Sequence, residues 1–155
     1  MKKIEDISQP FKFAESCMFQ YLENLARIEA LRDDLKMVDM QSSVKIQSYE
    51  EYSPTVGYID NIPVRLMKID MLESLIAGLE RWTKPITRLL NDLDSPYNVS
   101  PERQDLLNIL RIRYIHRNTW DRSLEYLKMR RETFSERRKR LVEMAIGYMG
   151  LKMRN

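Results

Sequence analysis

Apolar residues recur at intervals of three and four along most of this 155-residue chain. This spacing gathers them on one face of an α-helix. Only four glycines and six prolines interrupt a sequence rich in Leu, Met, Arg, Lys and Glu, and such a composition favours helix over sheet. The pattern therefore predicts an all-α protein with two long N-terminal helices and a group of shorter C-terminal ones.

One amphipathic helix is predicted from residue 10 to residue 38. Its apolar stripe consists of Phe11, Ala14, Met18, Tyr21, Leu25, Ile28, Leu35 and Val38. Cys17, Leu22 and Leu31 widen the stripe. A helix of this length cannot bury its apolar face alone, so it requires a partner helix.

Residues 39–62 interrupt the periodic pattern. They mix serines and tyrosines with Pro54 and Gly57 and sustain no helical or alternating period. We expect a long irregular connection here, either a hinge, a contact surface or a disordered segment.

A second long helix is predicted to open at Pro63, because proline suits the first helical position. Pro85 lies inside this pattern and is expected to kink the helix near Arg81 and Trp82 or to divide it. The apolar stripe consists of Val64, Met67, Met71, Leu75, Leu79, Trp82, Ile86, Leu89 and Leu93. The two long stripes could pack against each other or against a second subunit, and the sequence does not separate these options. Residues 1–94 are therefore interpreted as a helical oligomerisation or partner-binding region.

The charge balance changes sign near residue 102. Residues 1–102 carry 12 Lys/Arg and 17 Asp/Glu, whereas residues 103–155 carry 14 and 6. A basic segment joined to an acidic one suggests that one end meets a polyanion and the other meets protein. Just before the change, Ser100 and Pro101 form a helix start, with the serine as N-cap. We take the turn-rich residues 94–100 as the boundary of a domain at 101–150.

Three helices with short breaks are predicted in this C-terminal domain, at residues 101–116, 120–127 and 130–148. Asn118 is expected to take a left-handed conformation and Thr119 to cap the second helix. A short helix, a tight turn and a longer helix have the dimensions of a helix-turn-helix unit, whose second helix enters the major groove of DNA.

The last helix can be oriented by placing Phe134 in the core. Steps of about 100° per residue then turn Glu132, Ser135, Glu136 and Lys139 outward, with Arg131 and Arg140 beside them. Such side chains are suitable for contacting base edges, and nearby arginines are suitable for contacting phosphates. The candidate DNA-binding residues are Arg117, Thr119, Arg122, Arg130, Arg131, Glu132, Ser135, Glu136, Arg137, Arg138 and Lys139. The alternative is an ordinary helical bundle with a solvated basic helix.

The run ILRIRYIHRNTWDRSLEYLKMRRETFSERRKRLVEMAIGYMGLKM resembles the end of RinA/ArpU-type phage late-gene transcriptional regulators. The resemblance is carried by Leu110 to Tyr114, Thr119–Trp120, Thr133–Phe134, Arg137–Arg138, Val142 and Gly150–Leu151. The run is also similar to the promoter-reading fourth region of sigma factors. The resemblance implies a recognition helix over residues 130–141 that reads DNA with Arg131, Glu132, Ser135 and Glu136. The chain departs from the pattern at Ser123–Leu124, Lys128 and Arg130.

Catalytic chemistry has little basis in this sequence. His116 is the only histidine and Cys17 the only cysteine, which excludes an internal disulfide and a cysteine-based zinc site. The acidic pairs lack metal-ligand spacing, and no glycine-rich phosphate loop occurs. We expect no enzymatic activity, no cofactor and no metal. The N-terminal residues lack a signal peptide pattern, and no apolar run approaches membrane-span length. We therefore expect a protein without membrane association in the cytoplasm of a bacterial host cell.

The leading hypothesis is a sequence-specific transcriptional regulator that binds double-stranded promoter DNA, an activator of phage late genes as the resemblance implies. Its N-terminal helices would form a homodimer or higher homo-oligomer or contact RNA polymerase. One alternative is a sigma-like factor that binds core RNA polymerase. Another is a small terminase-type DNA packaging protein, and a third is a helical adaptor without a DNA role.

Overall fold

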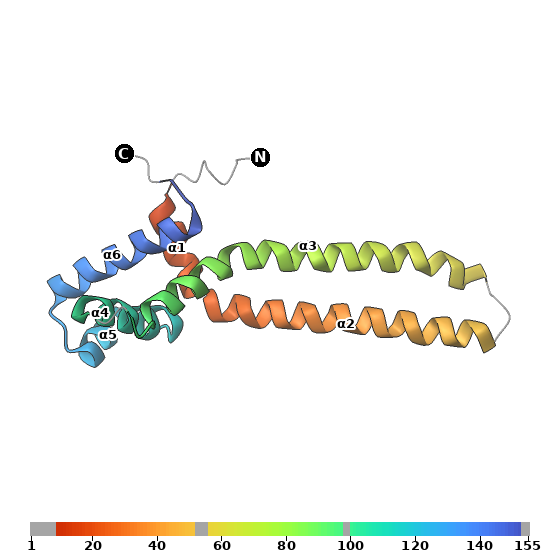
Figure 1. Ribbon diagram of the computed structural model, residues 1–155, viewed down its shortest axis with the longest axis horizontal. Helices are drawn as coiled ribbons and strands as arrows, with labels where there is room; N and C mark the ends of the chain where they lie inside the picture. Colours follow the sequence, from red (N-terminus) through yellow and green to blue (C-terminus); the bar gives the residue numbers. More distant parts are fainter. Residues whose placement is uncertain (1–8, 52–55, 98–99, 153–155) are drawn as a thin grey trace. The chain divides into compact units, whose positions relative to one another are not determined.

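The computed structural model describes residues 9–51, 56–97 and 100–152, with side chains omitted for 41–61. Within these ranges every regular element is helical and no strand occurs, which confirms the all-α prediction (Figure 1). The elements are α1 (Pro10–Phe19), α2 (Tyr21–Glu51), α3 (Val56–Leu93), α4 (Pro101–Ile109), the π-helical segment η2 (Leu110–Ile115), α5 (Trp120–Leu127) and α6 (Arg131–Met149). None of the helices in the described ranges is long and apolar enough to cross a membrane.

Two compact units divide the chain. Residues 1–23 and 82–155 form the first, and residues 24–81 form the second. This division differs from the boundary predicted at residues 94–100, because α1 and the C-terminal turns of α3 belong with the C-terminal helices. The first unit is therefore discontinuous in sequence. We call it the head, and we call the second unit the hairpin.

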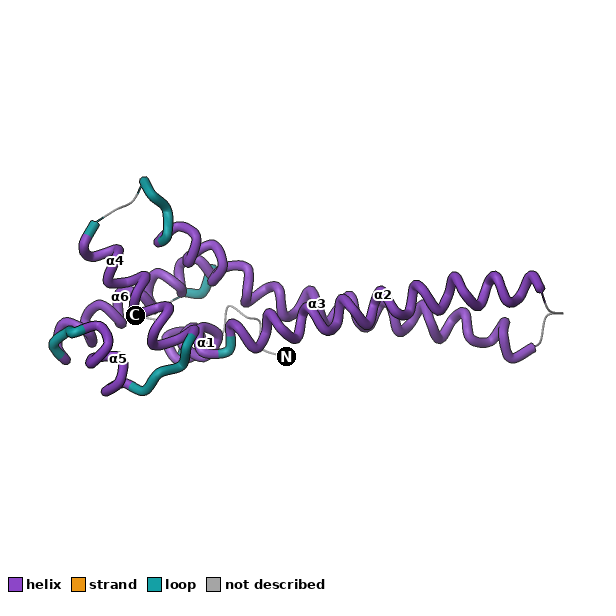
Figure 2. Tube along the Cα trace, turned by 90° about the horizontal axis from the view of Figure 1, so that it is seen from below, coloured by secondary structure: helices purple, strands orange, loops and turns teal. Residues whose placement is uncertain are grey.

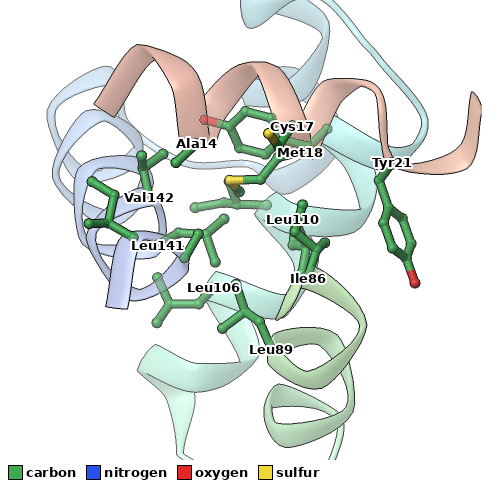
Figure 3. Close-up of a cluster of buried hydrophobic side chains, with 14 of the residues drawn as sticks. Ala14, Cys17, Met18, Tyr21, Ile86, Leu89, Leu106, Leu110, Leu141 and Val142 are labelled. Carbon is green, nitrogen blue, oxygen red and sulfur yellow. The ribbon is translucent and has the colours of Figure 1, made fainter. Parts of the chain in front are cut away.

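The head has a single apolar core to which α1, α3, α4, η2 and α6 all contribute (Figure 3). From α1, Ala14 and Met18 are fully buried, and Ile86 and Leu89 of α3 are buried with them. The C-terminal helices contribute the largest share, namely Leu106, Leu107, Ile109, Leu110, Tyr114, Phe134, Leu141, Val142, Ala145, Ile146 and Met149. Each helix supplies an apolar face that the others cover, so the head has the layered packing of a small globular domain.

The hairpin consists of α2 and α3, which run side by side in two perpendicular views (Figures 1 and 2). Ile28 and Val38 of α2 are buried, as are Leu72 and Ile76 of α3. With the half-buried Leu31 and Leu35, the inward positions of α2 are separated by three and four residues, which is the spacing of a coiled-coil seam. Arg32 and Glu80 form an ion pair between the helices.

The helix predicted over residues 10–38 is wrong in one respect, because it is interrupted. α1 ends at Phe19 and α2 begins at Tyr21, with Gln20 between them at φ −91° and ψ 3°. The apolar stripe serves two different cores, since Ala14 and Met18 are buried in the head and Ile28 in the hairpin. A break lets each part orient its own apolar face.

The irregular connection predicted at residues 39–62 is also largely replaced by helix. α2 continues to Glu51 and α3 begins at Val56, so only residues 52–55 separate them, and these lie outside the described residues. Pro63 lies within α3, and Pro85 does not divide it. Proline has a helix-compatible φ and removes one backbone hydrogen bond, and a long helix supported by a neighbour tolerates this loss. Missing apolar periodicity did not prevent helix formation.

The predicted inward stripe of α3 is correct only toward its C-terminal end. Ile86, Leu89 and Leu93 are buried. Toward the N-terminal end, Val64, Met67, Met71 and Leu75 are exposed, and Leu72 and Ile76 are buried instead. This part of α3 carries two apolar stripes, and only one of them can face α2.

Candidate nucleic-acid interface

The scaffold of the C-terminal helices begins with a capped helix. Ser100 is extended, and its Oγ accepts a hydrogen bond of 3.2 Å from the Arg103 backbone N–H. Pro101 occupies the first turn, where its missing N–H has no intrahelical partner to lose. This confirms the predicted start of α4, which continues directly into η2.

Side-chain hydrogen bonds hold the link between η2 and α5. Asn118 was expected to be left-handed, but Arg117 takes that conformation, with φ 55°. Asn118 Nδ2 instead donates to the Ile112 carbonyl at 2.9 Å, and Arg113 Nη1 donates to the Asn118 carbonyl at 2.7 Å. Thr119 then caps α5 as predicted, with Oγ1 accepting from the Arg122 N–H at 3.2 Å. These contacts fix where α5 starts.

A three-residue turn joins α5 to α6. Lys128 ends α5 in the left-handed conformation at φ 54°, and Arg130 is extended just before α6. The rings of Trp120 and Phe134 meet edge to face with their centroids 4.6 Å apart. A short helix, a tight turn and a longer helix thus lie where the helix-turn-helix unit was predicted. The local fold accommodates the unusual Ser123, which is buried and donates to the Thr119 carbonyl at 2.8 Å.

The orientation of α6 agrees with the angular prediction. Phe134 is fully buried, and Leu141 and Ala145 follow it on the inner face. The outward positions are exposed and carry mixed charge: Arg131, Glu132, Ser135, Glu136, Lys139 and Arg140. The polar face proposed for base contacts is therefore free of core packing.

Arg138 occupies a different place from the one predicted. Its side chain is only 23% exposed, and Nε and Nη2 lie 2.8 and 2.7 Å from the Glu15 carboxylate of α1. The same carboxylate accepts a 2.8 Å hydrogen bond from the Tyr114 hydroxyl. The Arg138 guanidinium also lies 5.1 Å from the centre of the Trp120 ring. Arg138 therefore fastens α6 to α1 and is not available to contact a phosphate.

Burial raises the pKa of Tyr114 far above its usual range, and the hydrogen bond to Glu15 raises it further. The phenol therefore remains a donor, and Glu15 accepts from both Tyr114 and Arg138. The sequence analysis missed Glu15. The available signal was its position among the aromatic and apolar residues of α1, where an acidic side chain needs a partner.

Other candidate arginines are paired with acids that the sequence analysis also overlooked. Glu102 of α4 binds Arg140 and lies 3.0 Å from Arg137. Longer and more exposed contacts join Arg117 to Glu23 at 3.9 Å and Arg131 to Asp121 at 3.7 Å. By contrast, the exposed Arg122, Arg130 and Lys139 form no ion pair within the described part of the chain.

Comparisons with family models, with curated proteins and with solved structures found no match for this chain. The described residues also contain no group of three or more His, Cys, Asp or Glu side chains that could hold a metal ion. The geometry of the helices and the charge of the residues that they expose are therefore the features that bear on function.

Proposed function

We propose that the chain is a sequence-specific DNA-binding transcriptional regulator that reads the major groove with the exposed face of α6. The observation that carries the proposal is the α5–turn–α6 geometry together with the outward Arg131, Glu132, Ser135, Glu136 and Lys139. A recognition helix contacts base edges with residues near its N-terminus, and Arg131, Glu132 and Ser135 lie in the first turns of α6.

The contacts described above also revise which residues would neutralise phosphates. Arg138 is held by Glu15, and Arg137 by Glu102. Arg122 in the first turn of α5 and Arg130 just before α6 are exposed, so we assign the phosphate contacts to them. A phosphate contact strengthens binding to every sequence, whereas a base contact discriminates between sequences.

The experiment begins with selection from a pool of duplexes that contain about 20 randomised base pairs. We expect a defined motif to be enriched, with tight binding to it in a fluorescence anisotropy titration. Binding without any enriched motif would contradict sequence-specific recognition. Absence of binding even at low salt would favour the helical adaptor.

The enriched duplex then distinguishes residues that contact bases from residues that contact phosphates. Ser135→Ala and Arg131→Ala should weaken binding to the motif by about 5- to 150-fold, the equivalent of 1–3 kcal/mol per base contact, and affect random DNA much less. Arg122→Ala and Arg130→Ala should weaken binding to both DNAs and reduce the salt slope by about one. Arg27→Ala is a matched control, because it removes an exposed arginine from α2 of the hairpin. Equal losses on both DNAs for all four variants would contradict the assignment.

The resemblance extends the proposal to activation of phage late genes, with RNA polymerase as a further partner and a homo-oligomer formed through the N-terminal helices. Transcription from a template that carries the enriched motif tests this role. Stimulation of a polymerase that already holds its sigma factor is expected for an activator. Transcription by core polymerase with this protein and without any other sigma factor would favour the sigma-like alternative.

A further inference from the structure

The N-terminal part of α3 has an apolar face that is exposed in the described part of the hairpin. Val64, Met67, Met71 and Leu75 are 62%, 71%, 55% and 49% exposed. Their neighbours Leu72 and Ile76 face the seam with α2 and are 5% and 8% exposed. The exposed residues, with the exposed Gly78, form one line along the helix, which we call the ridge. The ridge positions include no charged side chain.

The spacing of the ridge is palindromic. Positions 64, 67, 71, 75 and 78 are separated by three, four, four and three residues, so they are symmetric about Met71. In an isologous interface residue i contacts residue j while j contacts i. A two-fold axis through Met71 therefore pairs Met71 with itself, Met67 with Leu75 and Val64 with Gly78. The average step of 3.5 residues is close to one helical turn, so the five positions stay on one face of the helix.

Side-chain size selects the antiparallel pairing over the parallel one. In the parallel arrangement Gly78 would meet Gly78 and leave a gap at one end of the contact. In the antiparallel arrangement the branched Val64 lies opposite Gly78, where no atom within 4 Å surrounds the position of an added Cβ. Large residues opposite small ones allow two helices to interdigitate closely.

We infer that the ridge binds the ridge of a second copy of this chain, antiparallel and centred on Met71. The five ridge positions are uncharged, so a partner that packs on them must itself be apolar there, because charged groups would be buried without counter-ions. The inference does not depend on DNA binding, and it refines the expected homo-oligomer to one face and one register.

The size of the ridge sets the expected strength of the dimer. From residue 64 to residue 78 it extends about 21 Å at 1.5 Å per residue. A strip of this length and one helix wide is smaller than the ~800 Å² per partner of a standard interface. The dimer should therefore form and dissociate with concentration in the micromolar range.

Sedimentation of the protein without DNA tests whether the ridge is a dimer interface. Wild-type protein should shift from monomer to dimer with concentration. Met71→Glu should weaken dimerisation at least about tenfold, since two carboxylates would meet on the axis. Leu66→Glu is the matched control: Leu66 is also exposed, at 58%, but lies about 140° around the helix from Met71. A wild-type monomer at all concentrations, or equal loss in both variants, would overturn the inference.

Oxidative cross-linking tests the register. Met71→Cys should form a disulfide between copies, because the two positions face each other. Val64→Cys alone should not, since its symmetry mates would lie about 21 Å apart, whereas Val64→Cys combined with Gly78→Cys should cross-link. Wild-type protein is the control, because its single Cys17 is buried. Cross-linking of Val64→Cys alone, or none by Met71→Cys, would contradict the antiparallel register.

Discussion

The head and the hairpin bury their apolar side chains in different ways. In the head, α1, α3, α4, η2 and α6 share one core, and its large side chains, such as Met18, Tyr114 and Phe134, are fully buried. In the hairpin, two helices meet along one seam, and apolar residues such as Met67 and Met71 remain exposed. The described helices of the head thus cover one another's apolar faces, whereas the hairpin has a seam that stabilises it and a second apolar face that is exposed.

The largest expected effect is in the head. Phe134→Ala should lower the free energy of unfolding by about 3–5 kcal/mol, because it leaves a cavity in a closed core. Phe134 is fully buried, and its ring contacts Trp120. Urea unfolding followed by tryptophan fluorescence measures this, since Trp82 and Trp120 both belong to the head. A loss below about 1 kcal/mol would show that the head core is as adaptable as a surface.

Breaking an ion pair should also destabilise the head more than the hairpin. Glu15→Gln should cost about 3 kcal/mol, because it leaves the partly buried Arg138 without its counter-ion. Arg32→Gln should cost at most about 1 kcal/mol, since the Arg32 side chain is 58% exposed in its pair with Glu80. Urea unfolding monitored by circular dichroism compares the two variants. Similar losses would remove this distinction between head and hairpin.

Two adjacent residues test the assignment of faces on α3. Leu72→Ala should lower stability by about 2–3 kcal/mol, because its side chain fills the seam. Met71→Ala should change the stability of the monomer by no more than about 0.5 kcal/mol, because an exposed residue loses few contacts. Thermal unfolding of dilute protein measures both. A larger loss for Met71→Ala would mean that the ridge packs within the monomer.

A further effect concerns alkaline pH and the head alone. Burial raises the pKa of Cys17 from 9.0 to about 11. The raised folded-state pKa gives stability that is fully present below pH 9 and is lost as pH rises toward 11. Between pH 8 and pH 10 the loss should be roughly 1.4 kcal/mol. Urea titrations at the two pH values measure it, and Cys17→Ala should remove this part of the pH dependence.

Local signals in the sequence predicted the C-terminal helices well. Ser100 and Thr119 cap helices as expected, because an N-cap needs only the residues that follow it. The outward face of α6 was also predicted, since one buried residue and a fixed angular step determine it. Whether that face reads DNA stays a prediction.

Contacts between distant segments could not be predicted in the same way. The pairing of Glu15 with Arg138 joins residues 123 positions apart, and no local pattern specifies it. On α3 the sequence contains two apolar stripes, and periodicity alone does not say which one meets α2. The helical extension of α2 beyond residue 39 could not be predicted either, because no apolar periodicity accompanies it.

The discontinuity of the head has a consequence for the order of folding. During synthesis α1 is made before the other helices of its core, which belong to residues 82–155. The hairpin is complete before those residues are made, and its antiparallel helices bring its first and last residues together. The entropic cost of closing a long loop is thereby met early by local helix pairing. Pairing of the hairpin helices therefore lowers the entropic cost of bringing α1 to the C-terminal helices that bury it.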